Sequence, residues 1–355
     1  MSHEITWPRL LSTLVEGSDL TIREATWAMH QVMAGESTPA QLAGLLVALR
    51  IKGETVDEIV GFRDAVLENA LPLEVDPMVL DIVGTGGDPY GAVINISSIA
   101  SVIDAASGTP VLKHGNRAAS SSSGASDVLT ALGVDITIPA ERVAQVLAET
   151  GISFANAAMF HPGFRHAGPA RRELGISTLF NILGPLCNPA RPEASAVGIS
   201  SLERVPLMVG VFQTRGATAL VYRGDDGIDK LTTTGHSHVW EVSRGAVTEH
   251  DLDPLDLGVP RASIDSLLGS GPEYNAGLAR AVLAGERGPV RDIVLLNAAA
   301  GLVAFALAGD PAQVQVPFVE RMRAKLAVAA EAVDSGAAEA KLAEWVAATN
   351  APASS

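Results

Sequence analysis

The sequence lacks cysteine pairs, is poor in aromatic residues and carries few basic side chains. Among its 355 residues the single cysteine, Cys187, excludes an intrachain disulfide and favours a reducing compartment. Cys187 lies in the apolar stretch Gly184–Cys187, so we interpret it as a small buried side chain rather than a nucleophile. Only 4% of the residues are aromatic, while Ala, Gly, Val and Leu are abundant. This composition favours closely packed helices and buried strands over an all-β sandwich.

The balance of charge argues against nucleic acid as a partner. Proteins that bind nucleic acid gain much of their affinity from Lys and Arg side chains that meet phosphates. Here 40 acidic residues outnumber 25 basic ones, the net charge is −15, and no run of Lys or Arg is present. We interpret the acidity as a contribution to solubility. An anionic substrate would need a local cluster of hydrogen-bond donors or cations that overcomes the repulsion from the net negative charge.

No segment has the pattern of a signal peptide or of a membrane span. Met1–Glu4 has no basic region followed by an apolar core, so no signal peptide is expected. The longest uncharged apolar stretch, Ile293–Gly309, has 17 residues, fewer than the roughly 20 that a membrane span needs. We expect it to form a buried helix that follows a strand at Val290–Leu296. A cytoplasmic location and no membrane partner are predicted.

The chain is long enough for roughly two domains, and the period of its apolar residues changes along it. Residues 8–70 are expected to be helical, with a capping box at Thr21 and Glu24 and a proline in the first turn at Pro39. Beyond them, short apolar runs bounded by turn residues predict buried strands that alternate with helices. Strands are expected at Met78–Val83, Pro110–Lys113, Ala194–Ile199, Thr218–Tyr222 and Val239–Val242, and a helix near Ile96–Ala106. This alternation predicts an α/β domain with a mostly parallel central sheet.

A glycine-rich turn, Gly84–Asp88, follows the first predicted strand directly. Three glycines in four residues let backbone N–H groups approach a ligand closely and form an anion-binding concavity. Pro89 rules out the dinucleotide-binding fingerprint, and the Gly-Lys-Ser/Thr of a P-loop is absent. Asp88 would repel a phosphate unless a cation lies between them, which favours a bound divalent ion. The alternatives are a tight turn without a ligand and an Asp88 that caps the next turn.

A second polar segment follows the next strand. Lys113–Arg117 and the Ser-rich run from Ser120 to Asp127 place a lysine, an arginine, an amide and several hydroxyl groups near a strand end and a helix start. Ligands of open α/β sheets bind beyond the carboxyl ends of the strands, and helix N-termini attract anions. The two segments together predict a phosphate or diphosphate site. The alternative is a polar loop with a Ser N-cap.

Eight segments stand out, in order, along nearly the whole chain. They are Ala48–Thr55, Asp81–Asp88, Asn95–Ser98, Lys113–Arg117, Ser120–Asp127, Arg171–Gly175, Phe180–Leu186 and Val290–Asn297. They resemble the successive signatures of the anthranilate phosphoribosyltransferase family. One glycine turn has little specificity, whereas eight ordered matches have much.

The resemblance implies an enzyme of two domains with the active site at their hinge. The small helical domain would comprise residues 1–75, joined by helices from about 162–190, and the large α/β domain residues 76–355. The family acts as a homodimer through the small domain. Its substrates are phosphoribosyl diphosphate and anthranilate, and its cofactor is Mg²⁺. Since the aromatic amine is neutral at pH 7, we assign no residue as an essential general base.

The resemblance also implies site residues. Asp88, Lys113 and Arg171 would be catalytic, with Arg171 facing the anthranilate carboxylate, and Ser97 and Asp229 would hold Mg²⁺. The substrate-binding set would comprise Gly84, Thr85, Gly86, Gly87, Asp88, Asn95, Ile96, Ser97, Ser98, Lys113, His114, Gly115, Asn116, Arg117, Ser120, Ser121, Ala125, His161, Phe164 and Arg171.

The sequence departs from the family pattern at Gly227–Lys230, where Lys230 replaces a carboxylate that normally helps to hold a second Mg²⁺. Three alternatives are open. Asp225 or Asp226 could take the place of the missing carboxylate, Lys230 could contact the diphosphate in place of the ion, or the second metal site could be lost. The segment Pro89–Ile94 is also one residue longer than in the family and has no Thr, and Ala157–Met159 lacks a proline that the family often has.

These departures leave other functions open. A paralogue with another aromatic acceptor or with reduced activity is one alternative, and a pyrimidine-nucleoside phosphorylase-like enzyme is a second. A binding protein without turnover is a third. Phosphorolysis of thymidine or uridine and calorimetric binding of phosphoribosyl diphosphate would discriminate among them.

Overall fold

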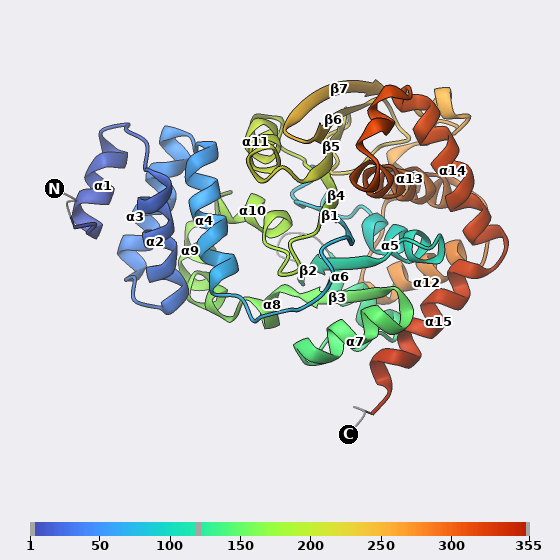
Figure 1. Ribbon diagram of the computed structural model, residues 1–355, viewed down its shortest axis with the longest axis horizontal. Helices are drawn as coiled ribbons and strands as arrows, with labels where there is room; N and C mark the ends of the chain where they lie inside the picture. Colours follow the sequence, from blue (N-terminus) through green and yellow to red (C-terminus); the bar gives the residue numbers. More distant parts are fainter. Residues whose placement is uncertain (1–3, 118–121, 353–355) are drawn as a thin grey trace.

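The computed structural model describes residues 4–117 and 122–352 and contains a small helical domain and a larger α/β domain (Figure 1). The helical domain starts with four helices: α1 (Trp7–Val15), α2 (Ile22–Ala34), α3 (Pro39–Lys52) and α4 (Val56–Glu68). Helices α2, α3 and α4 each begin with a capping box in which a threonine binds the N3 amide and the N3 side chain binds back. The capping box expected at Thr21 and Glu24 and the proline expected in the first turn of a helix at Pro39 are confirmed.

A seven-stranded sheet forms the centre of the large domain, in the order β3-β2-β1-β4-β5-β6-β7. The strands from β3 to β5 are parallel to their neighbours, while β6 and β7 are antiparallel additions at one edge. The strands are β1 (Leu80–Gly84), β2 (Val111–Gly115), β3 (Ile152–Asn156), β4 (Ala194–Gly198), β5 (Thr218–Gly224), β6 (Ser237–Ser243) and β7 (Ala246–Leu252). The prediction of a mostly parallel sheet is confirmed.

Helices cover both faces of this sheet and connect the two domains. They are α5 (Ile96–Ala106), α6 (Ala125–Leu132), α7 (Ala140–Thr150), α8 (Ala157–Phe160), α9 (Gly168–Leu174), α10 (Phe180–Leu183), α11 (Val205–Arg215), α12 (Pro272–Leu283), α13 (Pro289–Gly309), α14 (Phe318–Asp334) and α15 (Ala337–Asn350). Short 3₁₀ turns are η1 (Pro162–His166), η2 (Gly184–Leu186), η3 (Leu202–Arg204), η4 (Pro254–Leu257), η5 (Ile264–Leu267) and η6 (Pro311–Gln315).

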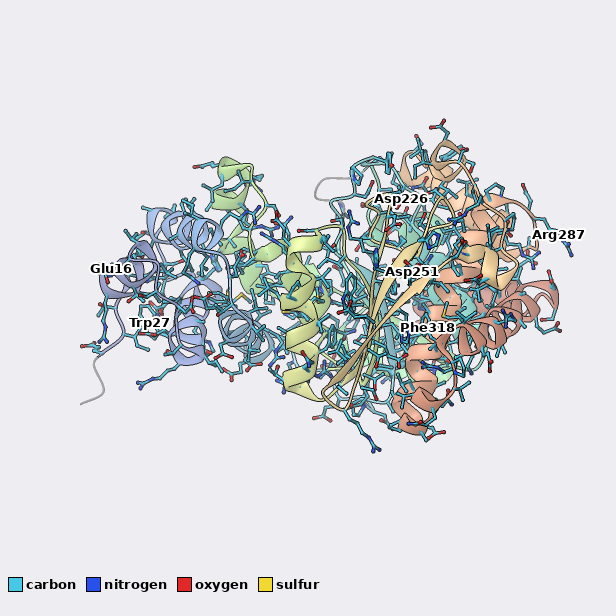
Figure 2. All side chains as sticks on the ribbon, turned by 90° about the horizontal axis from the view of Figure 1, so that it is seen from above. Glu16, Trp27, Asp226, Asp251, Arg287 and Phe318 are labelled. Carbon is cyan, nitrogen blue, oxygen red and sulfur yellow. The ribbon has the colours of Figure 1, made fainter. Side chains whose placement is uncertain are left out.

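Two hydrophobic cores lie on opposite faces of the sheet, because successive strand residues point to opposite sides. On β5, Leu220 and Tyr222 belong to the core under α5 and α13, whereas Ala219 and Val221 belong to the core shared with the helical domain. Figure 2 labels Phe318 in the first core and Trp27 beside the second. The helical domain is therefore packed onto the sheet through one continuous apolar core.

The segment between β3 and β4 carries the short elements η1, α9 and α10, which lie between the two domains (Figure 1). Helix α9 contacts α3, and η1 contacts α2. At Gly163, a β-carbon would lie 2.6 Å from the carbonyl oxygen of Met33. This contact requires glycine and fixes η1 against the helical domain.

One expected strand is wrong. Val290–Leu296 lies inside α13, a 21-residue helix that starts after Gly288 and whose residues are mostly buried. A short apolar β-branched run does not distinguish a buried strand from a buried helix. Helix α13 is long and apolar enough to cross a membrane by length and composition, but 72% of its most apolar window is buried inside the protein.

Candidate active site

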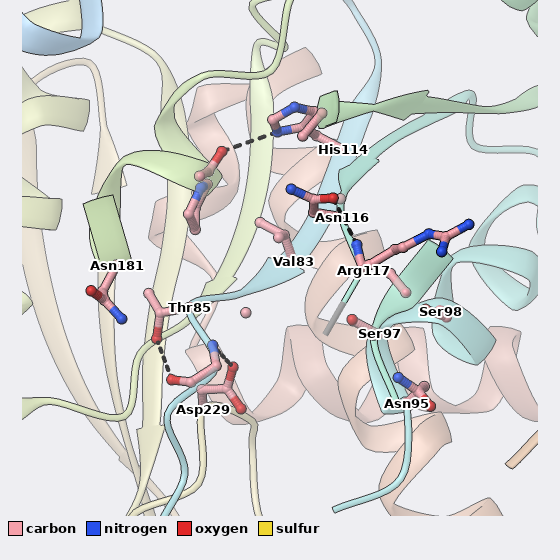
Figure 3. A pocket seen from close by; sticks show the side chains of 18 of the residues that line it. Val83, Thr85, Asn95, Ser97, Ser98, His114, Asn116, Arg117, Asn181 and Asp229 are labelled. Atoms are coloured by element: carbon pink, nitrogen blue, oxygen red, sulfur yellow. Dashed lines mark hydrogen bonds between the residues drawn. The ribbon is translucent and has the colours of Figure 1, made fainter. Parts of the chain in front are cut away.

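A cavity of about 310 Å³ opens where β1 and β2 end (Figure 3). We call two parts of its lining the charged wall and the aromatic wall. The charged wall consists of Gly84, Thr85, Gly86, Asp88, Asn95, Ser97, Ser98, Lys113, Asp229 and Lys230. The aromatic wall consists of His114, Phe164, Arg171, Phe180 and Asn181. The position agrees with the rule that ligands of parallel sheets bind beyond the carboxyl ends of the strands.

The glycine-rich turn after β1 approaches the loop that carries Asp229 very closely. A β-carbon at Gly84 would lie 2.1 Å from Oδ2 of Asp229, so only glycine fits there. Gly86 adopts φ 70° and Gly87 φ 77°, the left-handed region that favours glycine. The amide of Gly86 donates to Oδ2 of Asp229 at 2.7 Å, as Figure 3 shows. The turn is thus fixed by the Asp229 carboxylate.

Asp88 lines the cavity and also caps the following turn. Its Oδ1 accepts hydrogen bonds from the amides of Tyr90, at 3.0 Å, and Gly91, at 2.8 Å. The capping alternative raised by the sequence is therefore correct for the local structure. The longer segment that follows is held in place, because Val93 forms a β-bridge with Leu268.

Lys113 lies on β2 with its side chain almost fully buried. Its Nζ donates to the carbonyl oxygen of Ile82 at 2.5 Å and to Oγ of Ser97 at 3.3 Å. Burial lowers the pKa of Lys113 to about 8, although the negative charges of Asp81 and Asp104 act to raise it. Burial also raises the pKa of Asp81 to about 6, although Lys113 opposes that shift. A buried ammonium that lines a cavity is suited to bind an anion.

The loop after β5 brings Asp229 and Lys230 to the cavity. Nζ of Lys230 donates to Oδ1 of Asp229 at 2.7 Å and to the Asp229 carbonyl oxygen at 2.8 Å. Asn297 of α13 holds both backbone groups of Leu231, accepting from its N–H at 3.0 Å and donating to its C=O at 2.9 Å. The core helix α13 thereby fixes the backbone next to Lys230.

Asp225 and Asp226, the two carboxylates considered as substitutes for the one that Lys230 replaces, do not line the cavity. Oδ1 of Asp225 lies 3.3 Å from Nε2 of His238. Oδ2 of Asp226 accepts from the hydroxyl groups of Thr232, at 2.6 Å, and Thr234, at 2.7 Å. Compensation by either carboxylate is not supported.

The start of α5 and the loop after β2 complete the charged side. The side-chain amide of Asn95 donates to the carbonyl oxygen of Ser123 at 3.0 Å and accepts from Asn275 at 2.9 Å. These bonds hold the first turn of α5, with Ser97 and Ser98, toward the cavity (Figure 3). Free backbone N–H groups at a helix start attract anions.

Aromatic rings in and behind the aromatic wall meet at tilted and edge-to-face angles. The ring centroids of His161 and Phe164 lie 5.3 Å apart, and those of Phe164 and Phe180 lie 5.8 Å apart. The guanidinium of Arg171 lies 4.9 Å from the centroid of Phe180. Burial lowers the pKa of the half-buried Arg171, which nevertheless stays charged. This wall offers one cation and flat apolar surfaces, which suits an aromatic carboxylate.

His114 is neutral in this setting. Burial, and then the nearby His161, lower the pKa of His114 to about 3. Nδ1 lies 3.0 Å from the carbonyl oxygen of Gly184, as Figure 3 shows, so Nδ1 carries the proton. Nε2 then remains an acceptor, and within the described residues it has no hydrogen-bond partner. His114 therefore cannot donate a hydrogen bond to a ligand through Nε2, and this atom is buried from solvent.

Most of the predicted site residues meet at this cavity, and a few do not. Ile96 and His161 are buried behind it, and Gly87 lies in the turn without lining it. Ser120 and Ser121 lie outside the described residues. The remaining predicted residues all line the cavity: Gly84, Thr85, Gly86, Asp88, Asn95, Ser97, Ser98, Lys113, His114, Gly115, Asn116, Arg117, Ala125, Phe164, Arg171 and Asp229.

The sequence did not assign several lining residues to the site, among them Phe180 and Asn181. Phe180 and Asn181 lie in one of the eight segments, so their sequence signal was present but was not assigned to the site. Lys230 lines the cavity, as the alternative in which it contacts the diphosphate requires.

Comparison with known proteins gives the class. The model of the helical bundle domain of a glycosyl transferase family matches residues 8–70, and the model of the family's a/b domain matches residues 76–339. The fold, the cavity and these matches define a two-domain glycosyltransferase.

Individual relatives narrow the class. Over 346 residues the chain is 76% identical to the anthranilate phosphoribosyltransferase of Clavibacter michiganensis subsp. michiganensis, covering 98% of this chain and 99% of that protein. The anthranilate phosphoribosyltransferase of Leifsonia xyli subsp. xyli is 66% identical over 349 residues, with 98% and 100% covered. This chain belongs to the anthranilate phosphoribosyltransferase family.

Solved structures agree with this assignment. Anthranilate phosphoribosyltransferase from Thermus thermophilus superposes with a TM-score of 0.87 at 41% identity, covering 96% of this chain and 99% of that one. The enzyme from Saccharomyces cerevisiae in complex with PRPP and Mg has a TM-score of 0.85 at 25% identity, with 98% and 99% covered.

Proposed function

We propose that this protein transfers the phosphoribosyl group of phosphoribosyl diphosphate (PRPP) to the amine of anthranilate and releases diphosphate, a step of tryptophan biosynthesis. The observation that carries the proposal is one cavity with two unlike walls. The charged wall suits a diphosphate, through Lys113 and the glycine turn, and the aromatic wall suits an aromatic carboxylate, through Arg171 and Phe180.

The reaction needs stabilised charge and correct positioning. As the bond between the anomeric carbon and the diphosphate oxygen breaks, its electron pair moves to the diphosphate, where donors such as Lys113 are most effective. The neutral amine attacks without a strong base, and holding both substrates in one cavity supplies much of the remaining rate.

Mg²⁺ fits the charged wall at one position. This ion takes oxygen ligands and is commonly held by one or two carboxylates together with substrate phosphates. Ser97 lines the cavity and its hydroxyl oxygen is contacted by Lys113 at 3.3 Å, which leaves a lone pair for an ion that arrives with the diphosphate. Bound there, the ion would neutralise charge on the leaving diphosphate.

Asp229, the second predicted ligand, fits an ion poorly. Lys230 lies 2.7 Å from its Oδ1, and the amide of Gly86 lies 2.7 Å from its Oδ2. Both oxygens already accept hydrogen bonds, and Lys230 itself offers no oxygen. We therefore keep Ser97 as the proposed metal contact and assign Asp229 to positioning of the glycine turn.

Several further features are part of the same proposal. The domain division at residues 75 and 76, with the segment from about 162–190 added to the helical domain, is supported by the contacts of η1 and α9. A homodimer through the helical domain is supported by Val15 and Ile51, apolar side chains that are 79% and 81% exposed. The buried single cysteine is compatible with a cytoplasmic location.

Consumption of anthranilate, followed by its fluorescence over a series of Mg²⁺ concentrations, tests the function. We expect consumption to require PRPP and to release one diphosphate for each anthranilate. If anthranilate is not consumed while thymidine or uridine undergoes phosphorolysis, the proposed function is wrong and the nucleoside phosphorylase alternative holds. Light scattering at increasing protein concentration tests the homodimer.

A further inference from the structure

Lys230 is a buried cation that the proposed reaction does not yet use. Its side chain is 10% exposed and lines the cavity. A β-carbon at Gly84 would lie 2.5 Å from Nζ of Lys230, so the glycine turn and the ammonium are in close contact. Burying an ammonium costs several kcal/mol unless it is well paired. A role as a solvated surface charge therefore does not explain why Lys230 is buried at this position.

Asp229 provides only part of the compensation that Lys230 needs. One carboxylate serves two donors, since Oδ1 receives Lys230 and Oδ2 receives the amide of Gly86. A second ammonium, Lys113, lines the same cavity. Two cations that repel each other across one cavity are stabilised by an anion that contacts both.

The charge and the donor atoms at residues 229 and 230 suit a diphosphate oxygen better than a metal ion. An ammonium has three donors, of which Lys230 uses one for the Asp229 carbonyl and one for its carboxylate. The third remains for a ligand oxygen. Asp225 and Asp226 do not line the cavity and supply no oxygen there.

We propose that Lys230 serves as a built-in cation for the leaving diphosphate of PRPP, so that no divalent ion is needed at residues 229 and 230 besides the one that arrives with the substrate. This inference rests on the proposed function. The bond between the anomeric carbon and the diphosphate oxygen breaks, its electron pair goes to that oxygen, and Lys230 donates a hydrogen bond to the diphosphate without transferring its proton. The anthranilate nitrogen forms the new bond and loses its proton to solvent.

The count of bound metal ions tests this inference directly. Mn²⁺ replaces Mg²⁺, and free Mn²⁺ is measured by electron paramagnetic resonance in the presence of saturating PRPP. We expect one ion per chain for the parent and two for Lys230→Glu, which restores a carboxylate beside Asp229. Arg287→Glu is the charge-matched control, because Arg287 is an exposed residue at the outer end of the large domain (Figure 2), and it should keep one ion.

The affinity for PRPP without metal gives an independent measurement. By calorimetry in EDTA we expect Lys230→Met and Lys230→Gln to bind PRPP about 10- to 100-fold more weakly than the parent, as for loss of one hydrogen bond to a charged group. Arg287→Gln should bind as the parent does. Because Lys230→Met frees one oxygen of Asp229, added Mg²⁺ should improve its affinity more than that of the parent. Thermal unfolding shows whether each variant is folded. If one of the two neutral variants misfolds, the other still gives the measurement.

The outcomes separate the two proposals. Two Mn²⁺ ions in the parent, or unchanged metal-free affinity in both neutral variants, would overturn the role of Lys230 while leaving the transferase function intact. A parent that consumes no anthranilate and binds no PRPP with or without metal would overturn both.

Discussion

The charged wall and the aromatic wall of the cavity are held in place by different parts of the molecule. The charged wall stands on strand ends and on the start of α5, where the Asp229 carboxylate accepts a hydrogen bond from the backbone and the Asn95 amide donates one to it. Apart from His114 on β2, the aromatic wall stands on the short elements η1, α9 and α10, which pack on the core shared with the helical domain. Binding of the donor substrate and of the acceptor substrate should therefore be separable by mutation.

Loss of Lys113 should have the largest effect and should act through the charged wall. We expect Lys113→Met to lower kcat/KM for PRPP about 100- to 1,000-fold, the range found when a donor to a developing anion is removed. The KM for anthranilate should change little. Steady-state kinetics with each substrate varied in turn gives both values. Equal losses of kcat/KM for PRPP and for anthranilate would show that the two walls are not independent, provided that thermal unfolding finds the variant folded.

Loss of Arg171 should act through the aromatic wall alone. For Arg171→Gln we expect the KM for anthranilate to rise about 10- to 100-fold, as for loss of a hydrogen bond to a charged group. The Kd for PRPP, measured by calorimetry, should stay at the parent value. Arg172→Gln is the matched control, because the neighbouring Arg172 is exposed and outside the cavity lining. A large rise in the PRPP Kd of Arg171→Gln would contradict the separation.

The charged wall should also lose function as the pH rises. Burial lowers the pKa of Lys113 to about 8, while Asp81, Asp229 and Asp104 oppose this shift and Lys230 reinforces it. The protonated form binds the anion, so kcat/KM for PRPP should fall roughly tenfold by about pH 9. Bound diphosphate stabilises the ammonium, so the corresponding fall in kcat should appear at higher pH.

Unfolding does not explain that loss. The pKa of Lys113 lies below its ordinary value of 10.5, so the unfolded chain binds more protons in the interval from about 8 to 10.5. The contribution of this group to stability therefore increases with pH across the interval. A pH profile of kcat/KM that stays flat to pH 9.5 would show that Lys113 remains charged throughout.

The smallest effect should come from Phe180, which touches Arg171 through its ring face. We expect Phe180→Leu to raise the KM for anthranilate about fivefold, because a cation–π contact contributes on the order of 1 kcal/mol. Phe180→Tyr keeps the ring and should behave as the parent does. If both variants weaken anthranilate binding equally, the contact between the Arg171 guanidinium and the ring face is not what positions Arg171.

The sequence predicted the charged wall better than the aromatic wall, for a physical reason. Gly84, Lys113 and Ser97 follow strands or start a helix, so their order along the chain already places them at one edge of a parallel sheet. Phe180 and Asn181 belong to short helices whose position depends on packing against the helical domain. No local pattern in the chain encodes that packing.

The strands and helices were also predicted unevenly from the sequence. The five strands expected from apolar runs all form, whereas β3 and β7 were missed and Val290–Leu296 proved helical. β7 is an edge strand with many polar residues, so it carries no strong periodic signal. Helix α13 is so uniformly apolar that periodicity cannot distinguish its first turns from a buried strand.

The clamp of Asn297 on Leu231 has a consequence for the residue at position 230. Because both backbone groups of Leu231 are secured by a side chain 66 positions away in the core, the residue just before it can be exchanged while the main chain keeps its course. A carboxylate and an ammonium can therefore replace each other at position 230 while the loop stays where it is, so one substitution decides which charge this side of the cavity presents.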